Sequence, residues 1–366
     1  MKIILTETQK SVLKKIKKWY KKNEQKYFVL SGCAGSGKST LVKYIIEEIG
    51  ISESVVSFMA YTGKAAQVLA AKGHPNSSTI HSKIYNFRED KRGNFEKILK
   101  MRSDLRSFKL FIVDECSMLN EELIDDLLFF NIPIIFIGDH NQLDPIEGNN
   151  FLLENPDIRL NEPLRQAKES SIIELSEAIF NGTKLNIGRY GNNVWIVDKL
   201  PLKTFKNANQ VICGYNKTRR KYNTLMRLGK EKDFPIKGEK LICKKNNWEK
   251  YVFTNVGELY LTNGLIGMAG NTVVRYSGLD FYPEITYNKF ECKFDSHFWE
   301  TGKELKGLKK YDKFDLGYCI TTHASQGSEY ENCVVIVEPI GSTNLQKRKW
   351  LYTAITRAKS KLILKV

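Results

Sequence analysis

The chain has 366 residues, more than one ordinary hydrophobic core accommodates, so we expect two or more domains. It carries 57 lysines and arginines against 41 acidic residues, and this net charge of +16 indicates either a nucleic-acid partner or a lysine-rich proteome. No apolar run approaches the ~18 residues of a membrane span, and the seven cysteines stand singly. The composition therefore argues against a membrane protein, a disulfide framework and a zinc site, and a reducing cytoplasm fits best.

The first predicted element is a helix over QKSVLKKIKKWYKK, residues 9–22. Thr6 and Gln9 precede and open it in a T-x-x-Q pattern, which is typical of a capping box. A glutamine at this place could also read the edge of an adenine base. The local pattern favours the cap, and the two roles do not exclude each other.

A phosphate-binding loop follows the apolar run YFVL, which is typical of a buried strand. The stretch 32–39 fills the pattern G-x-x-x-x-G-K-[ST] and leads into the helical sequence TLVKYIIEEIG. Its backbone N–H groups are expected to surround phosphate oxygens, while Lys38 reaches the β and γ phosphates and Ser39 binds Mg²⁺. The predicted ATP-binding residues here are Gly32, Ala34, Gly35, Ser36, Gly37, Lys38, Ser39 and Thr40.

Two later strands end in polar side chains. LFIVDECSML, residues 110–119, places Asp114 where it can hold Mg²⁺ and Glu115 where it can orient or deprotonate an attacking water. IPIIFIGDHNQLDPI, residues 132–146, places Gln142 beside the expected γ-phosphate. Helical stretches alternate with these strands, so the pattern predicts a parallel α/β sheet with its site at the carboxyl ends of the strands.

Residues 85–108 interrupt this alternation. The turn sequence KRGN separates two strand-capable runs, so we expect a β-hairpin. Phe87 or Phe95 could stack on a base pair, which is worth ~1–3 kcal/mol per base. Both rings could equally pack the hairpin onto its own lobe.

A second α/β layer without a phosphate loop is predicted beyond residue 160. Arg165 stands in LNEPLRQAK, and Arg357 lies on a predicted helix near the C-terminus. Arginines from a second lobe can stabilise charge on a transferring γ-phosphate. Residues 231–311 interleave aromatics with lysines, which suits either a small β core or a single-stranded nucleic-acid channel. Burial is the commoner use of such aromatics.

The ordered motifs resemble those of superfamily 1 helicases, and within them the RecD-like and Dda-like branch, superfamily 1B. The matching stretches run from residue 6 to the end: GCAGSGKST, AYTGKAAQVL, STIHSKI, VDECSM, GDHNQLDPI, EPLRQA, YCITTHASQGSEY and LYTAITRAKSKLIL. The chain departs from the pattern at Asp144, where many relatives carry proline. The resemblance implies two RecA-like lobes, with ATP between them and single-stranded DNA across both.

The resemblance also implies roles for individual residues. The hydrolysis set comprises Lys38, Ser39, Asp114 and Glu115, with Gln142 as γ-phosphate sensor and with Arg165 and Arg357 as arginine fingers. Further nucleotide contacts are implied for Gln9, Gln326, Gly327 and Glu329. The implied DNA contacts are Thr62, Lys64, Thr79, His81, Thr322, His323 and Ser325, with His140 as a weaker candidate. In this family the hairpin acts as a strand-separation pin, which assigns that role to Phe87 or Phe95.

We expect the chain to consist of two lobes and two insertions. The first lobe is expected to comprise 1–84 and 109–159, with the hairpin 85–108 inserted. The second lobe is expected to comprise 160–230 and 312–366. The inserted stretch 231–311 is expected to form a small β-barrel similar to a Src-homology-3 barrel, although NWEKYVFTNVGELY lengthens the gap between two of its strands.

The predicted function is that of an ATP- and Mg²⁺-dependent DNA helicase that moves 5′ to 3′ on single strands and opens forked duplexes. We expect a minimal, phage-type core that acts as a monomer in the cytoplasm, without a membrane partner and with replication or recombination proteins as partners. An RNA helicase with the same ATPase lobes is the first alternative. A P-loop switch or small-molecule kinase is the second, although neither would need the motifs near the C-terminus.

Overall fold

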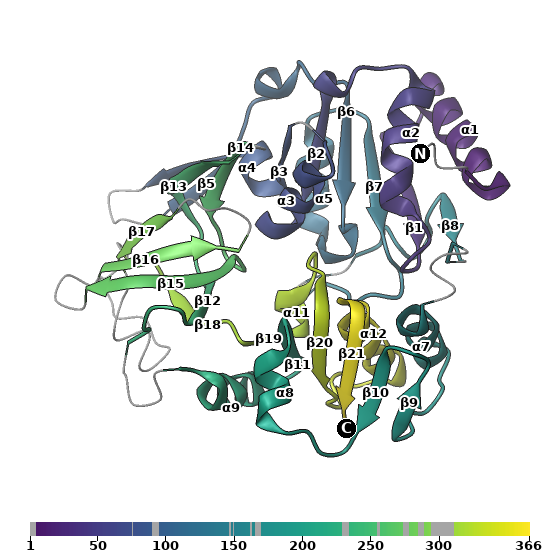
Figure 1. The fold of residues 1–366 in the computed structure, drawn as a ribbon. Coiled ribbons are helices and arrows are strands. Elements are labelled where there is room, and N and C mark those ends of the chain that lie inside the picture. Colours follow the sequence, from purple (N-terminus) through teal and green to yellow (C-terminus); the bar gives the residue numbers. More distant parts are fainter. Residues whose placement is uncertain are drawn as a thin grey trace. The chain divides into compact units, whose positions relative to one another are not determined.

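The computed structural model describes residues 5–74, 76–89, 95–145, 148, 150–161, 163–164, 170–228, 234–254, 257–273, 278–284, 289–293 and 311–366 (Figure 1). The chain divides into two compact units. Unit 1 comprises Met1–Tyr61, Ala65–Asn86 and Lys97–Gly182, and unit 2 comprises Thr62–Lys64, Phe87–Glu96 and Thr183–Val366. Within the described ranges, no helix is both long and apolar enough to cross a membrane.

Unit 1 is built on a six-stranded parallel sheet, as the alternation of strands and helices predicted. The strands lie in the order β3 (Ser77–Thr79), β2 (Val56–Ala60), β6 (Leu110–Asp114), β7 (Ile134–Gly138), β1 (Tyr27–Gly32) and β8 (Ile158–Leu160). Four of them, β1, β2, β6 and β7, are apolar and buried on both faces, which is typical of parallel sheets covered by helices.

Helices cover both faces of this sheet. The helices of unit 1 are α1 (Glu7–Lys22), α2 (Lys38–Ile49), α3 (Gly63–Ala71), α4 (Ile80–Ile84), α5 (Glu121–Phe129) and α7 (Ser171–Phe180), with 3₁₀ turns at Glu53–Val55, Arg102–Leu105 and Cys116–Met118. One core joins α1, α2 and α3 to one face of the sheet. On the other side Phe111 of β6 packs edge-on against Phe130, which directly follows α5, with ring centroids 6.4 Å apart.

Helix α7 extends unit 1 beyond the boundary expected at residue 159. Strand β8 pairs with β1 through Leu160, and Leu160 lies in the core of this sheet. Burial, together with Glu177 of α7, raises the pKa of the Cys33 thiol at the phosphate loop to about 12. The compact unit therefore continues to Gly182.

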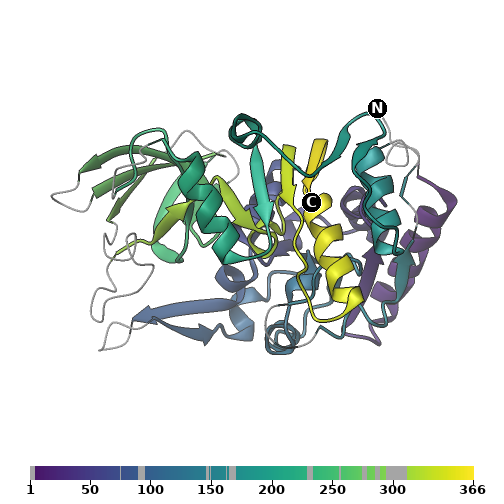
Figure 2. The same ribbon diagram turned by 90° about the horizontal axis from the view of Figure 1, so that it is seen from below.

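The stretch predicted to form a hairpin contains two paired strands, β4 (Tyr85–Glu89) and β5 (Phe95–Leu99). They form an extended two-stranded ribbon, drawn in blue in Figure 2. Phe87 is partly buried, whereas the turn at 90–94 and the side chain of Phe95 lie outside the description.

Unit 2 contains a second six-stranded sheet, in the order β19 (Cys319–Thr321), β11 (Gln210–Cys213), β20 (Tyr330–Ile336), β21 (Ala358–Lys365), β10 (Val194–Val197) and β9 (Gly188–Tyr190). All pairs are parallel except β9 with β10. The helices of this sheet are α8 (Leu202–Asn207), α9 (Asn216–Met226), α11 (Thr322–Ser325) and α12 (Asn344–Ile355). The two parallel sheets confirm the predicted fold class.

The stretch inserted between α9 and β19 is antiparallel. Five strands pair in the order β17 (Phe290–Lys293), β16 (Gly278–Pro283), β15 (Ile266–Val273), β12 (Lys240–Cys243) and β18 (Phe314–Leu316), and β13 (Asn247–Thr254) pairs with β14 (Gly257–Leu261). Phe281 is buried in its core against Phe314, whereas Tyr251 and Tyr282 are 46% and 38% exposed. A closed barrel of the Src-homology-3 type stays a prediction.

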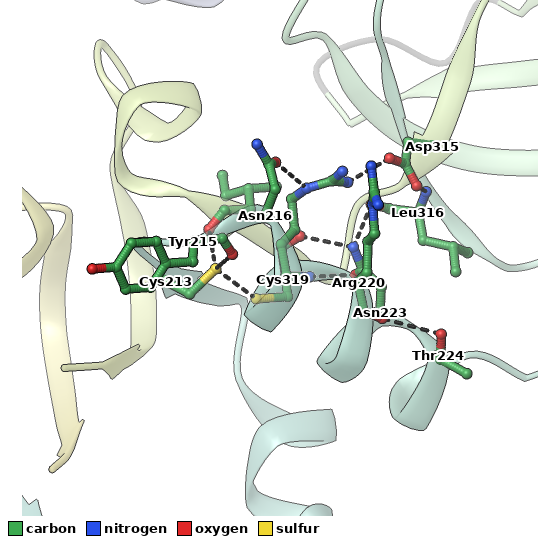
Figure 3. Close-up of polar contacts among 11 residues, drawn as sticks. Cys213, Tyr215, Asn216, Arg220, Asn223, Thr224, Asp315, Leu316 and Cys319 are labelled. Carbon is green, nitrogen blue, oxygen red and sulfur yellow. Dashed lines mark hydrogen bonds and ion pairs between the residues drawn. The ribbon is translucent and has the colours of Figure 1, made fainter. Parts of the chain in front are cut away.

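A buried polar junction fixes this insertion to the sheet of unit 2 (Figure 3). The Asn223 amide on α9 donates to the carbonyls of Leu316 and Cys319 at 3.0 and 2.9 Å, and its oxygen accepts from the Cys319 N–H at 2.7 Å. Beside it, the Arg219 guanidinium donates to the Asp315 carboxylate. Strand β18 of the insertion and strand β19 of the sheet are thus both held by α9.

Candidate functional site

The phosphate loop lies between β1 and α2 in the conformation that an anion site requires. Gly35 and Gly37 have φ of 73° and 81°, the left-handed region that favours glycine. A Cβ on Gly37 would also lie 2.7 Å from Leu164 Cδ1 and 2.8 Å from Gln9 Nε2. Gly37 is therefore required both for its backbone conformation and for space, and the Gln9 amide lies at the loop.

Gln9 performs the capping role that its pattern predicted. Its N–H donates to Thr6 Oγ1 at 3.2 Å, and the Thr6 N–H donates to Gln9 Oε1 at 3.0 Å, so the capping box is confirmed. Gln9 is only 3% exposed. Its contact with adenine stays a prediction.

The Lys38 ammonium lies at the centre of the loop. It donates to the carbonyls of Gly32 and Cys33 at 2.5 and 2.8 Å, and the Ser36 hydroxyl also donates to the Cys33 carbonyl, at 2.8 Å. Lys38, Ser39 and Thr40 form the first turn of α2, where backbone N–H groups have no acceptor within the helix. A cation and a helix N-terminus thus meet at the loop, which suits a phosphate group.

The carboxylate pair lies at the end of β6, two strands from β1 in the sheet. Burial raises the pKa of Asp114 above its ordinary value, although the Glu115 N–H, which donates to it at 2.9 Å, opposes that shift. Glu115 has φ 54° and ψ 42°, a left-handed conformation that is costly for a glutamate. Strain of this kind concentrates at functional sites, and here it falls on the residue predicted to act on the attacking water.

Gln142 follows β7 and is 5% exposed. Its N–H donates to the Asp139 carbonyl at 3.2 Å, but among the described residues its side-chain Oε1 has no hydrogen-bond partner. Leaving a buried carbonyl unpaired costs about 1–3 kcal/mol, so the atom suits an external donor such as a water on a phosphate. The role of Gln142 as γ-phosphate sensor stays a prediction.

The candidate DNA residues of unit 1 lie around α4. Thr79 is the N-cap of α4 and accepts from the Ser82 N–H at 3.1 Å, and His81 packs between Tyr61 and Tyr85 with centroid distances of 5.8 and 5.7 Å. Burial lowers the pKa of His81, so a contact from it to phosphate would be a neutral hydrogen bond at pH 7. Thr62 and Lys64 flank Gly63, the first residue of α3, in the short stretch assigned to unit 2.

His140, the weaker candidate, lies beside the phosphate loop. Its Nδ1 is 2.8 Å from the Ser31 hydroxyl at the end of β1. That contact gives His140 a structural role within the sheet, and its DNA contact stays a prediction.

Arg357 of unit 2 is held beside the predicted nucleotide-facing loop. It is 4% exposed, and its guanidinium donates to the carbonyls of Thr353 and Ser328 and to the Thr356 hydroxyl at 3.0–3.2 Å. Ser328 lies between the candidates Gly327, which has φ 70°, and Glu329, which is exposed and 3.5 Å from Lys359. Gln326, the third candidate of this loop, is 3% exposed. Arg165 lies outside the described residues.

The predicted DNA loop of unit 2 turns two of its hydroxyls inward. Thr322 and Ser325 are fully buried, and they donate to the carbonyls of Cys213 at 3.3 Å and of Thr322 at 2.7 Å. His323 between them is partly exposed, and burial lowers its pKa. Of these three side chains only that of His323 is partly exposed, and the DNA contacts of all three stay a prediction.

The structure adds residues that the sequence reasoning missed at the base of the hairpin. Tyr85 donates to the Asp126 carboxylate, and Lys97 Nζ lies 2.6 Å from Glu122. Glu122 and Asp126 are four residues apart on α5 and so lie on one face. The spacing of Glu122 and Asp126 in the sequence predicts two carboxylates on one helix face, and this pattern could have indicated that the hairpin is attached there.

Comparison with known proteins agrees with this geometry. Residues 4–198, more than half of the chain, match the AAA domain family, and residues 316–365 match the UvrD-like helicase C-terminal domain family. The chain is 26% identical to the ATP-dependent RecD2 DNA helicase of Deinococcus radiodurans, over 98% of this chain and 48% of the relative. It is 30% identical to the ATP-dependent DNA helicase dda of Enterobacteria phage T4, over 71% of this chain and 66% of the relative. The chain thus spans about half of the length of the RecD2 helicase and 66% of the length of the dda helicase.

Solved structures share the fold over the whole chain. A Pif1 helicase from a study of DNA unwinding at forked dsDNA superposes with a TM-score of 0.63 at 18% identity, over 100% of this chain and 92% of that chain. Bacteroides Pif1 in complex with ADP-AlF3 and ssDNA gives a TM-score of 0.61 at 18% identity, over 100% of this chain and 93% of that chain. The ordered motifs, the two parallel sheets and the family matches together show that the chain belongs to the superfamily 1B helicases, in the RecD-like and Dda-like branch.

Proposed function

We propose that this protein is an ATP-dependent DNA helicase that moves 5′ to 3′ along single-stranded DNA and separates a duplex ahead of it. One observation carries the proposal. A phosphate loop stands in unit 1, and unit 2 repeats the parallel sheet without such a sequence while holding the buried Arg357 beside the loop 326–329. A motor that couples hydrolysis to movement between two lobes needs both parts, whereas a one-lobe switch or kinase needs only the first.

Each polar group of the predicted site has a proposed chemical task. Lys38 and the first turn of α2 bind the β and γ phosphates. Glu115 accepts a proton from the attacking water or orients it, and Gln142 accepts from the same water through Oε1 while its amide donates to the γ-phosphate. Arg165 and Arg357 are proposed to stabilise the charge that develops on the transferring group.

The site also suits Mg²⁺. Asp114 is a carboxylate whose raised pKa reflects burial that a cation would offset, and the Ser39 hydroxyl on α2 is a second hard oxygen ligand. A Mg²⁺ ion held there would supply positive charge that offsets the negative charge of the phosphates. Asp114 and Ser39 are the residues that we propose to hold it.

The test of polarity uses forked substrates. A duplex with only a 5′ single-stranded tail is expected to be unwound with ATP, and the same duplex with only a 3′ tail is expected to stay paired. This direction is expected from the resemblance to the RecD-like and Dda-like branch. The residue types around His81 and His323 do not show which of the two regions binds DNA more tightly. Strand release is measured by fluorescence, together with the ATPase rate on DNA, on RNA and without nucleic acid.

Each outcome of this test decides between functions. An ATPase rate indifferent to nucleic acid would favour a P-loop switch, and activation by RNA alone would favour an RNA helicase. Preference for the 3′ tail would contradict the proposed direction. We propose single-stranded and forked DNA as the partners of a monomer in the cytoplasm, with replication or recombination proteins as further partners.

The hairpin gives a second test. Replacing Phe87 and Phe95 with alanine is expected to cut unwinding about tenfold, because a stacked base is worth ~1–3 kcal/mol, while DNA-stimulated ATPase stays within about twofold. Phe129→Ala, an exposed ring on α5, is the matched control. Parallel loss of unwinding and ATPase would show that the hairpin is a structural or DNA-gripping element and not a pin.

A further inference from the structure

An unusually basic stretch of unit 2 takes no part in the proposed ATPase or single-strand sites. Residues 199–228 contain eight lysines and arginines and no aspartate or glutamate. Two of the eight are neutralised from elsewhere in the chain, since Arg219 pairs with Asp315 and Arg227 with Glu239. The other six are exposed, and within the described part of the chain none forms an ion pair: Lys199, Lys203, Lys206, Lys217, Arg220 and Lys221.

The unpaired cations of α9 share one side of that helix. Lys217, Arg220 and Lys221 stand at i, i+3 and i+4, and all three are exposed, whereas Arg219, Asn223 and Met226 are buried. The neighbouring helix α8 adds Lys203 and Lys206, three residues apart. The rings of Phe205 on α8 and Tyr222 on α9 pack 4.7 Å apart and join the two helices.

This surface leads away from the proposed single-strand track. Helix α9 begins beyond the carboxyl end of β11, and α11, which carries His323, begins beyond the carboxyl end of the parallel neighbour β19. The other two cations of α9 follow Lys217 along the helix. Helix α8 directly precedes β11, so its lysines lie near the amino ends of the strands, opposite the end at which α11 begins. Figure 1 accordingly shows α8 and α9 below α11 within unit 2.

We propose that these six side chains, the basic face, bind the sugar-phosphate backbone of duplex DNA, beyond the single strand that the proposed helicase function already requires. Cations without carboxylate partners release counterions on binding phosphates and read no sequence. A single-strand groove usually carries a row of exposed aromatic rings. Of the three aromatics in residues 199–228, Phe205 and Tyr222 pack on each other, and Tyr215 is the one exposed ring, with its hydroxyl donating to the Pro339 carbonyl. Helix α1 is also lysine-rich, but Lys10, Lys17 and Lys22 there are paired with glutamates.

The test removes three charges from the basic face. The variant Lys217→Gln, Arg220→Gln, Lys221→Gln is compared with Lys14→Gln, Lys15→Gln, Lys18→Gln on α1, whose three exposed lysines carry the same charge. Fluorescence anisotropy gives the Kd for a 5′-tailed duplex and for the tail alone, at several salt concentrations. We expect about tenfold weaker binding of the tailed duplex at low salt and a salt slope shallower by up to about 2.7, at ~0.9 per lost contact.

The single strand supplies the internal reference. Affinity for the tail alone and ATPase stimulated by it are expected to stay within about twofold, which also shows that the variant is folded. The charge-preserving variant Lys217→Arg, Arg220→Lys, Lys221→Arg should bind the tailed duplex like the unaltered protein. Three results would contradict duplex binding by the basic face. They are an equal loss of affinity for the tailed duplex and for the tail alone, an equal loss of affinity in the α1 variant, and an unchanged affinity for the tailed duplex. An unaltered protein whose ATPase ignores DNA would instead overturn the helicase function.

Discussion

Lys38→Ala is expected to lower the ATPase rate by at least ~10³-fold while the protein stays folded. In the structure the ammonium group is held by the carbonyls of Gly32 and Cys33 at the phosphate loop, so it contributes charge there and not packing in the core. Alanine leaves the loop glycines and the helix N-terminus in place. It removes the cation that would offset the charge of the β and γ phosphates during transfer.

The measurement is steady-state ATPase with saturating single-stranded DNA, accompanied by thermal unfolding. Lys43→Ala, an exposed lysine one turn further along α2, is the matched control and should hydrolyse ATP normally. Near-normal turnover in folded Lys38→Ala would contradict the assignment of the loop as the hydrolysis site.

Arg357→Ala is expected to lower kcat by ~10³-fold or more with only a modest change in ATP affinity. An arginine that acts on the transition state contributes little to binding ATP in its ground state. The guanidinium is buried and anchored by Thr353, Ser328 and Thr356, so its position is fixed before any nucleotide binds. Preorganisation of this kind is what makes a charge effective in catalysis.

Because those hydrogen bonds also support the fold, a second variant is needed. Arg357→Lys keeps the charge but cannot reproduce the three contacts of the fork, and it should fold with a large loss of kcat. Arg348→Ala on the exposed side of α12 is the control. Nucleotide affinity is followed with a fluorescent ATP analogue, and hydrolysis by single turnover. If ATP affinity collapses while kcat survives, Arg357 binds the ground state and its proposed role is wrong.

The features of this protein that depend on neighbours along the chain could be predicted from its sequence. The strand, glycine loop and helix of residues 27–49 occur in order, and the structure has them as β1, the loop and α2. The capping box of Thr6 and Gln9 is likewise a short-range pattern, and both of its hydrogen bonds are present. Apolar runs long enough for buried strands predicted two parallel sheets for the same reason, because burial on both faces leaves a continuous hydrophobic signal.

Which polar side chains remain available for a ligand depends on contacts between distant segments, and these could not be predicted. Thr322 and Ser325 look like ideal phosphate contacts in the sequence, yet their hydroxyls bond to carbonyls inside unit 2, and His323 alone of the three is partly exposed. The Gln142 carbonyl is left without a partner among the described residues, which no local pattern reveals.

The adjacent arginines 219 and 220 show the physical reason most directly. Both are cations in one basic run, and the sequence does not distinguish them. Arg219 pairs with Asp315, 96 residues away in the chain, because strand β18 of the insertion brings that carboxylate to the buried side of α9, while Arg220 stays exposed. Which charges are neutralised, and hence which face can bind a polyanion, depends on contacts between distant segments that only the folded chain brings together.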